Sequence, residues 1–336
     1  MSIKGWATKE GTELFHLNVG LPPWAVRTLF GLRLAAIGVG TYLGETDEAT
    51  DTLQRQAITS LLALGCNVID CAPNYRNGRA EKSVGEALVH VADSIPRSAI
   101  FITTKVGLVP ENFEPPASFA LGPDRSCYDP QYLRLSLEGS LERLQLATVD
   151  CVFVHNLELL RLADIGAFPK RFASVAQSME SMVADGLTRS WGISSWQGFR
   201  VDETQPDYLS LDMLRSYLVP NLRYIQLPVG LWGSEALTGR WQGGENILSR
   251  ARELGVFASA PLLQGELAHI LRHHGNLIGQ AVNFVRDTAG VDIVLLGIKK
   301  PEHVCAWREM QLQEPRDVTD SFLTILDSLS AGPNFT

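Results

Sequence analysis

The chain has 336 residues and a formal net charge of −8, with 45% hydrophobic and 20% charged residues. This composition is typical of a soluble globular enzyme. The acidic balance argues against a nucleic-acid or membrane partner, because anionic nucleic acids and lipids bind basic surfaces. The N-terminus has no apolar signal region, and no run of about 18 apolar residues occurs. We therefore expect a cytoplasmic protein.

The cysteines exclude two further classes of protein. There are five, and they are scattered along the chain: Cys66, Cys71, Cys127, Cys151 and Cys305. Without a CxxC pair or a Cys/His cluster, the sequence predicts neither a disulfide framework nor a metal site. Three of them sit in or beside apolar runs, which is typical of small buried thiols.

Short apolar runs recur along the chain, and each is followed by a turn. There are eight, at residues 34–42, 66–72, 99–107, 149–156, 189–196, 222–229, 255–262 and 291–298. Near-continuous rather than alternating apolar strands indicate a parallel sheet that is buried on both faces.

Segments with helical periodicity lie between most of these runs. They occupy residues 51–64, 81–91, 132–144, 171–186, 246–255 and 278–290. Several end in a glycine that we interpret as a helix C-cap, namely Gly65, Gly186, Gly255 and Gly290. Eight strands alternating with helices predict a single (β/α)8 TIM barrel of the α/β class. The absence of GxGxxG after the first strand argues against a Rossmann fold.

We expect one domain, with the barrel at about 33–310, an N-terminal extension at 1–32 and a C-terminal tail at 311–336. Residues 1–30 are expected to cap the bottom of the barrel or to form a short hairpin. Residues 320–330 predict a final amphipathic helix.

Residues 108–130 form a long segment after the third strand, rich in proline and aromatic residues and without a period. Long loops of this kind are usually functional or disordered. We interpret it as a lid, because Phe113, Phe119 and Tyr128 offer apolar contact area. Together with the segment 230–244 and the C-terminal tail, it is expected to set substrate preference.

Four chemically active residues follow consecutive strands. Asp70 ends the second run, Tyr75 lies five residues later, Lys105 ends the third run and His155 ends the fourth. In TIM barrels the working residues sit at the C-terminal ends of the strands. Each residue alone could belong to a strand-end salt bridge with bystanders. The four together favour an active site.

These residue types suit proton transfer to an oxygen atom. A free tyrosine has a pKa of about 10, and a nearby ammonium is expected to lower it. Asp70 would keep Lys105 charged and in place, and His155 would hydrogen-bond the substrate oxygen. A hydride would have to come from a cofactor, because no side chain supplies one.

The motifs IGVGTY (37–42), IDCAPNYRNGRAEKSVGEAL (69–88), TTKVG, GISSW, IQLPV and LLGIKKPEHV follow one another in order. In this the chain resembles the aldo-keto reductase family over about residues 33–310. The resemblance implies NADPH-dependent reduction of an aldehyde or ketone, or the reverse oxidation, with Tyr75 as the general acid. Asp70, Tyr75, Lys105 and His155 match the family's catalytic tetrad.

The resemblance also implies an NADPH site. It comprises Gly40, Thr41, Asp70, Ser194, Ser195, Gln226, Ser259, Leu262, Gly297, Lys299, Lys300 and His303. The two lysines favour NADPH over NADH, because the additional phosphate accepts charge-assisted hydrogen bonds. Alternatively, they form a solvated turn that opens a helix at Pro301.

Three positions depart from the family pattern. Ser259 stands where a tyrosine stacks on the nicotinamide, Ser195 replaces an asparagine, and Trp307 replaces an asparagine of the adenine site. Trp196 or Trp232 could supply the missing stacking contact.

The substrate is expected to contact Tyr42, Asn156 and Trp232. The Trp, Phe and Pro content of the loops indicates an apolar or aromatic carbonyl compound rather than a free sugar. Two other functions stay open. One is an NADPH-binding regulatory module resembling the potassium-channel beta subunits. The other is a redox-neutral lyase or isomerase that uses Tyr75 and Lys105 as an acid/base pair.

Overall fold

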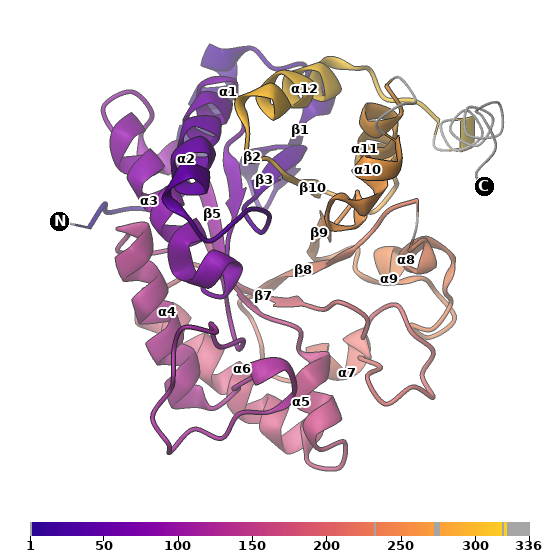
Figure 1. Cartoon of the computed structure of the whole chain (residues 1–336). Helices are drawn as coiled ribbons and strands as arrows, with labels where there is room; N and C mark the ends of the chain where they lie inside the picture. Colours follow the sequence, from indigo (N-terminus) through magenta and orange to yellow (C-terminus); the bar gives the residue numbers. More distant parts are fainter. Residues whose placement is uncertain (1, 232, 272–275, 318, 321–336) are drawn as a thin grey trace.

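Eight parallel strands close into a barrel in the order β10-β3-β4-β5-β6-β7-β8-β9 (Figure 1). The computed structural model describes residues 2–231, 233–271, 276–317 and 319–320. The strands of the barrel are β3 (Ile37–Gly40), β4 (Val68–Asp70), β5 (Phe101–Val106), β6 (Cys151–Val154), β7 (Trp191–Ser194), β8 (Leu222–Pro228), β9 (Gly255–Ser259) and β10 (Ile293–Gly297). Each strand lies within one of the eight apolar runs, so the predicted (β/α)8 barrel is confirmed.

Helices surround the strands, as Figure 1 shows. They are α2 (Glu48–Ala63), α3 (Arg79–Val91), α4 (Pro130–Leu144), α5 (Glu158–Ala163), α6 (Phe168–Ala184), α7 (Leu211–Arg215), α8 (Glu235–Thr238), α9 (Ile247–Arg250), α10 (Glu266–Leu271), α11 (Leu277–Asp287) and α12 (Pro301–Leu312). The helix expected over 246–255 is wrong in length, because only Ile247–Arg250 is helical.

Gly65 and Gly186 directly follow the C-cap residues of α2 and α6 and have positive φ angles, as expected of glycines that end a helix. Gly290 lies two residues beyond Thr288, the C-cap of α11, and Gly255 does not end a helix. Gly255 is the first residue of β9. A Cβ atom there would lie 2.5 Å from Cδ1 of Tyr224, so this glycine makes room for an aromatic ring inside the barrel.

The N-terminal segment forms a helix and then a hairpin that closes the barrel where its strands begin. Helix α1 (Lys9–Val19), which is not among the predicted helices, is followed by the antiparallel pair β1 (Val26–Leu29) and β2 (Leu32–Ala35). Leu29 and Leu34 belong to the same buried cluster as interior residues of the strands. The hairpin expected within residues 1–30 therefore extends to Ala35, and it also contributes to the cap.

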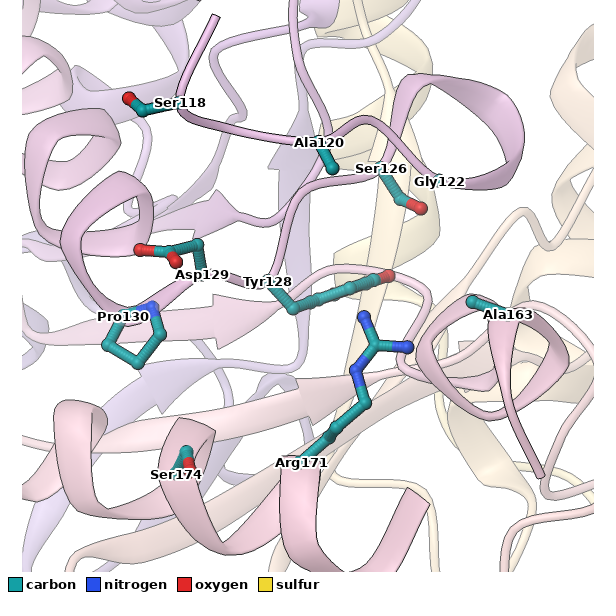
Figure 2. Close-up of a pocket in the computed structure, with 10 residues that line it drawn as sticks. All are labelled: Ser118, Ala120, Gly122, Ser126, Tyr128, Asp129, Pro130, Ala163, Arg171 and Ser174. Carbon is teal, nitrogen blue, oxygen red and sulfur yellow. The ribbon is translucent and has the colours of Figure 1, made fainter. Parts of the chain in front are cut away.

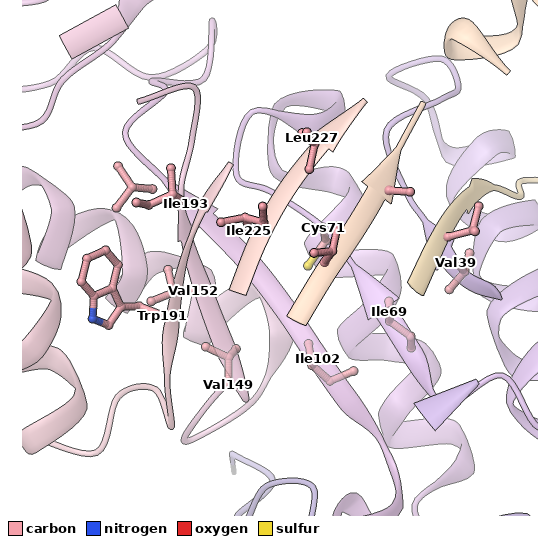
Figure 3. Packing of buried hydrophobic residues seen from close by; sticks show 14 of the residues in the cluster. Val39, Ile69, Cys71, Ile102, Val149, Val152, Trp191, Ile193, Ile225 and Leu227 are labelled. Carbon is pink, nitrogen blue, oxygen red and sulfur yellow. The ribbon is translucent and has the colours of Figure 1, made fainter. Parts of the chain in front are cut away.

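Side chains alternate between the two faces of each strand. On β5, Phe101 belongs to the cluster inside the barrel, whereas Ile102 belongs to the larger cluster that includes residues of the surrounding helices. Figure 3 shows part of this outer cluster, with Ile69 and Ile193 among its members. The alternation therefore turns every second residue of a strand toward the barrel interior.

Three further findings concern the C-terminal helix, the cysteines and the length of the helices. The predicted helix at 320–330 lies outside the described residues after Asp320. All five cysteines are free, and Cys305 is the exposed one. No helix in the described part of the chain is both long and apolar enough to cross a membrane.

Candidate functional site

Polar side chains from three neighbouring strands meet at the end of the barrel where the strands finish. Asp70 is the last residue of β4, Lys105 lies on β5, and His155 follows directly after β6. Lys105 shares the inner face of β5 with Phe101, since the two are four positions apart. Because β5 pairs with both β4 and β6, the three side chains converge.

Asp70 and Lys105 form a buried ion pair. The Lys105 ammonium donates to Asp70 Oδ2 over 2.6 Å and to the carbonyl of Cys71 over 3.0 Å. The other carboxylate oxygen accepts hydrogen bonds from the Thr103 hydroxyl at 2.7 Å and from Gln226 Nε2 at 3.0 Å. Both oxygens of Asp70 are thus paired, which offsets the cost of burying the charge.

Tyr75 lies beside this ion pair, at the start of the turn Tyr75–Gly78 that follows β4. The Lys105 ammonium is 4.7 Å from the centroid of its ring. The ring of His155 is 6.0 Å away and that of Tyr42 is 5.1 Å away, each in an edge-on arrangement. The structure therefore brings the four predicted catalytic residues together.

Burial decides the protonation state of Tyr75. It raises the pKa of Tyr75 to about 12, although the charge of Lys105 lowers this pKa. Lys105 thus acts on the pKa of Tyr75 in the expected direction, but desolvation of the phenolate outweighs the ammonium, so the pKa lies above its ordinary value. At neutral pH Tyr75 carries its proton.

Opposite effects act on Lys105. Burial lowers its pKa, but the charges and hydrogen bonds of Asp70 and Tyr75 outweigh burial and raise the pKa above its ordinary value. Lys105 therefore stays charged at neutral pH and can stabilise negative charge on a nearby oxygen.

His155 is uncharged at neutral pH. Burial, and then the charge of Lys105, holds the pKa of His155 well below 6.5. Its Nδ1 atom is buried and has no hydrogen-bond partner among the described residues. A neutral imidazole donates one hydrogen bond, which suits the orientation of a carbonyl oxygen.

These residues open onto a cavity of about 740 Å³. Predicted site residues that line it are Gly40, Tyr42, Asp70, Tyr75, His155, Asn156, Ser194, Ser195, Gln226, Ser259, Leu262, Gly297, Lys299 and His303. One predicted residue, Trp232, lies outside the described part of the chain.

Three predicted residues do not line the cavity. Lys105 is fully buried behind Tyr75. Thr41 is buried too, and its hydroxyl donates to the carbonyl of Asp70 over 3.0 Å, so it braces the end of β4. Lys300 precedes α12 as its N-cap residue and is absent from the lining, unlike its neighbour Lys299. The cationic wall predicted from two adjacent lysines therefore contains one of them.

Trp307 also lies away from the cavity. It is fully buried, and its indole donates to the carbonyl of Ile37 over 2.9 Å. This tryptophan thus packs α12 against β3. Ser259 lines the cavity without an aromatic ring, whereas Trp196, 37% exposed, lines the same cavity.

Sequence reasoning missed many lining residues. They include Leu43, Asn74, Leu108, Gln264, Ala268, Ile278, Ala306 and Met310. Leu43 and Asn74 are close in sequence to strand ends and could have been found by that criterion. The positions on α10, α11 and α12 carry no local signal, because their exposure to the cavity depends on how the helices pack.

The segment 108–130 contributes little to the cavity. Leu108 lines it, whereas Phe113 and Phe119 do not. Phe119 packs against Tyr132 of α4, and the Tyr128 hydroxyl donates to the carbonyls of His155 and Asn156. The aromatic residues expected to form a lid therefore face elsewhere in this structure.

Tyr128 also lines a separate hollow of about 340 Å³. Figure 2 shows Arg171 of α6 extending toward it from the opposite side, with Asp129 and Pro130 at the start of α4. Most of its lining is surface-exposed, and it does not include a residue of the cavity around Tyr75.

The polar groups that line the cavity are suited to binding NADPH. Ser194, Ser195 and Gln226 offer hydroxyl and amide groups next to Asp70, as a carboxamide requires. Lys299 lines the same cavity together with His303, whose Nδ1 is buried without a partner in the described structure. A cation and an imidazole suit a phosphate. No cluster of three or more His, Cys, Asp or Glu in the described residues could hold a metal ion.

The sequence profile of the Aldo/keto reductase family matches residues 36–213. The chain belongs to this family. The match includes β3 to β7 and the four predicted catalytic residues, but it ends before β8. The predicted cofactor residues from Gln226 onward therefore lie outside the matched range.

Curated relatives include D-arabinose 1-dehydrogenase of Saccharomyces cerevisiae, which is 27% identical over 185 residues, 53% of this chain and 49% of that protein. A protein of Schizosaccharomyces pombe named as a voltage-gated potassium channel subunit beta is 25% identical over 238 residues, 64% of this chain and 63% of its own. L-galactose dehydrogenase of Arabidopsis thaliana is 29% identical over 171 residues, 49% and 46% of the two chains. The chain thus spans about half to two thirds of the length of these relatives.

Solved structures share the fold. An aldo/keto reductase from Klebsiella pneumoniae in complex with NADP and acetate has a TM-score of 0.64 at 22% identity, covering 92% of this chain and 96% of its own. Glycerol dehydrogenase from Gluconobacter oxydans has a TM-score of 0.65 at 21% identity, covering 94% and 100%. At these identities the similarity shows that the fold is shared and shows nothing more.

Proposed function

We propose that this protein interconverts a carbonyl compound and an alcohol with NADP(H), and that Tyr75 is the general acid of the reduction. The observation that supports this most directly is the contact between the buried ion pair and a protonated phenol. Lys105 is held by Asp70 at 2.6 Å and lies 4.7 Å from the centroid of the Tyr75 ring, at the edge of the cavity.

Each residue has a separate part in the proposed reaction. NADPH, when bound, supplies the hydride. The Tyr75 hydroxyl donates a proton to the substrate oxygen as negative charge develops there. Lys105 stabilises the phenolate that remains, because its ammonium is charged and cannot reorient away from Asp70. The neutral imidazole of His155 donates a hydrogen bond to the same substrate oxygen.

For the cofactor, we propose NADPH rather than NADH, held by the amide and hydroxyl groups around Gln226 and by Lys299 and His303. Trp196 is the candidate for the stacking contact that Ser259 cannot make. The NADP complex of the Klebsiella relative supports this cofactor.

Two substrate classes remain. An apolar or aromatic carbonyl compound suits Tyr42, Leu108 and Trp196 in the cavity. Sugars and polyols are supported by the names of the dehydrogenases from yeast, Arabidopsis and Gluconobacter. Asn74, Asn156 and Gln264 in the lining would serve hydroxyl groups.

The experiment follows the near-ultraviolet absorbance of NADPH, which falls during reduction and rises during oxidation. Purified protein is mixed with NADPH and aromatic aldehydes in one series, and with NADP and D-arabinose, L-galactose or glycerol in another. Turnover in either series supports the function, and the series that responds identifies the substrate class. NADPH binding without any turnover would instead favour a regulatory module, as the similarity to the channel subunit permits. No binding of NADPH would favour a redox-neutral reaction.

A further inference from the structure

We propose that Arg76, the residue after Tyr75, is a positioning residue that fixes the phenol at the barrel mouth. This inference rests on the function proposed above. The Arg76 side chain is 1% exposed and is absent from the cavity lining, so it does not touch a substrate there. It acts through Tyr75, to which it is joined by the backbone.

The guanidinium of Arg76 ties the Tyr75 turn to the neighbouring loop and helix. Its Nε donates to the carbonyl of Glu45 over 2.8 Å, and a terminal nitrogen donates to Gln54 Oε1 over 2.9 Å. The other nitrogen contacts the carbonyl of Asp47 at 3.3 Å and forms an ion pair with Asp51. Planar guanidinium groups suit such multiple contacts, and a lysine could not make all of them.

These contacts continue back to the catalytic group. Gln54 Nε2 donates to the carbonyl of Thr41 over 3.2 Å, and the amide and hydroxyl of Thr41 both donate to the carbonyl of Asp70. Asp70 pairs with Lys105, and Lys105 lies over the Tyr75 ring. The contacts form a closed circuit, so that a shift of the arginine would change the relation between phenol and ammonium.

The backbone of the turn supports a specific role for this side chain. Arg76 has φ 52° and ψ 36°, and Asn77 has φ 54° and ψ 44°. Asparagine adopts this left-handed conformation more readily than arginine, for which it is unfavourable. The contacts of the guanidinium therefore hold Arg76 in a strained conformation, as is found at functional sites.

The variant Arg76→Gly tests the side-chain contacts independently of the backbone strain. Glycine adopts a positive φ without cost, so the variant keeps the turn conformation accessible and loses only the contacts. We expect kcat to fall by about 10- to 100-fold, as misplacement of a reacting group does. The KM for substrate and the Kd for NADPH should change by less than about twofold, because Arg76 does not line the cavity.

Asn77→Gly is the matched control. Asn77 has the same backbone conformation, but its side chain is bonded to the amide of Glu111 and not to α2. Its kcat should equal that of the wild type. Arg76→Lys should recover part of the loss in kcat, because a lysine can still pair with Asp51. If Arg76→Gly does not fold, Arg76→Lys replaces it in the comparison with the wild type.

A double-mutant cycle tests the circuit itself. Gln54→Met removes the link from the arginine to Thr41. If both residues act through one network, the double variant with Arg76→Gly loses less kcat than the product of the two single losses. Fully multiplicative losses would contradict the proposed circuit.

Hydrogen exchange gives a readout that needs no substrate. The amide of Tyr75 donates to the carbonyl of Ala72, and its protection should fall in Arg76→Gly but not in Asn77→Gly. If the wild type is active and the two variants Arg76→Gly and Asn77→Gly have the same kcat and the same amide protection as each other, Arg76 has no positioning role. An inactive wild type would overturn the proposed function, while exchange would still decide whether Arg76 holds the turn.

Discussion

Lys105 Nζ lies 2.6 Å from Asp70 Oδ2, and protein encloses both side chains. The two charges come from adjacent strands, and the pleat turns both toward the barrel interior. Neither charge would be tolerated at this depth without the other. The pair therefore supplies a fixed positive charge next to Tyr75.

Removal of the cation should affect stability as well as activity. In Lys105→Met, the buried carboxyl group of Asp70 loses its ion-pair partner, so we expect the free energy of unfolding to fall by about 3–5 kcal/mol and turnover to be lost. Urea unfolding measures the first effect. Lys82→Met is the control, because the Lys82 side chain is 66% exposed and its pair with Glu86 is worth at most about 1 kcal/mol. Equal stability of the two variants would contradict the buried pair.

The pH dependence should differ between the two directions of reaction. Burial raises the pKa of Tyr75 to about 12, so its acid form is present at neutral pH and is lost only as the pH rises toward this value. Reduction should therefore be independent of pH from neutral into the alkaline range. Oxidation requires the phenolate, and its rate should increase with pH over the same range. Initial rates in both directions test this, and an alkaline loss of reduction that begins near neutral pH would contradict it.

Cofactor preference should depend on Lys299 and not on Lys300, since Lys299 alone of the two lines the cavity. A charge-assisted hydrogen bond to phosphate is worth enough that Lys299→Met should weaken NADPH binding by about 10- to 100-fold. NADH binding should be unchanged. Lys300→Met provides the matched comparison, and fluorescence titration measures both cofactors. An equal loss of NADPH affinity in the two variants would mean that the additional phosphate of NADPH does not bind at Lys299.

The sequence permitted much of the architecture to be predicted. The apolar runs predicted the positions of the eight strands, because a parallel sheet buried on both faces needs nearly continuous apolar segments. Asp70, Lys105 and His155 were detectable because polar residues at the ends of such runs are unusual. Their meeting in space followed from the order of the strands.

Other features depend on distant contacts that leave no local pattern. From the sequence, Gly255 is interpreted as a helix cap because its position alone suggests one. Its actual role is to leave room for the ring of Tyr224 on the adjacent strand β8. The pKa of Tyr75 depends on how much protein surrounds it, and spacing along the chain does not encode that amount. Arg76 and Gln54 are 22 positions apart, and only the fold brings them together.

The most direct test of the account compares Tyr75→Phe with the wild type in a single experiment. The substitution removes one hydroxyl and keeps the ring between Tyr42 and His155. NADPH binding, measured by fluorescence, should remain within about twofold, while turnover of the best substrate should fall by at least about 10²-fold. A phenylalanine variant that binds NADPH and retains full turnover would contradict Tyr75 as the proton donor.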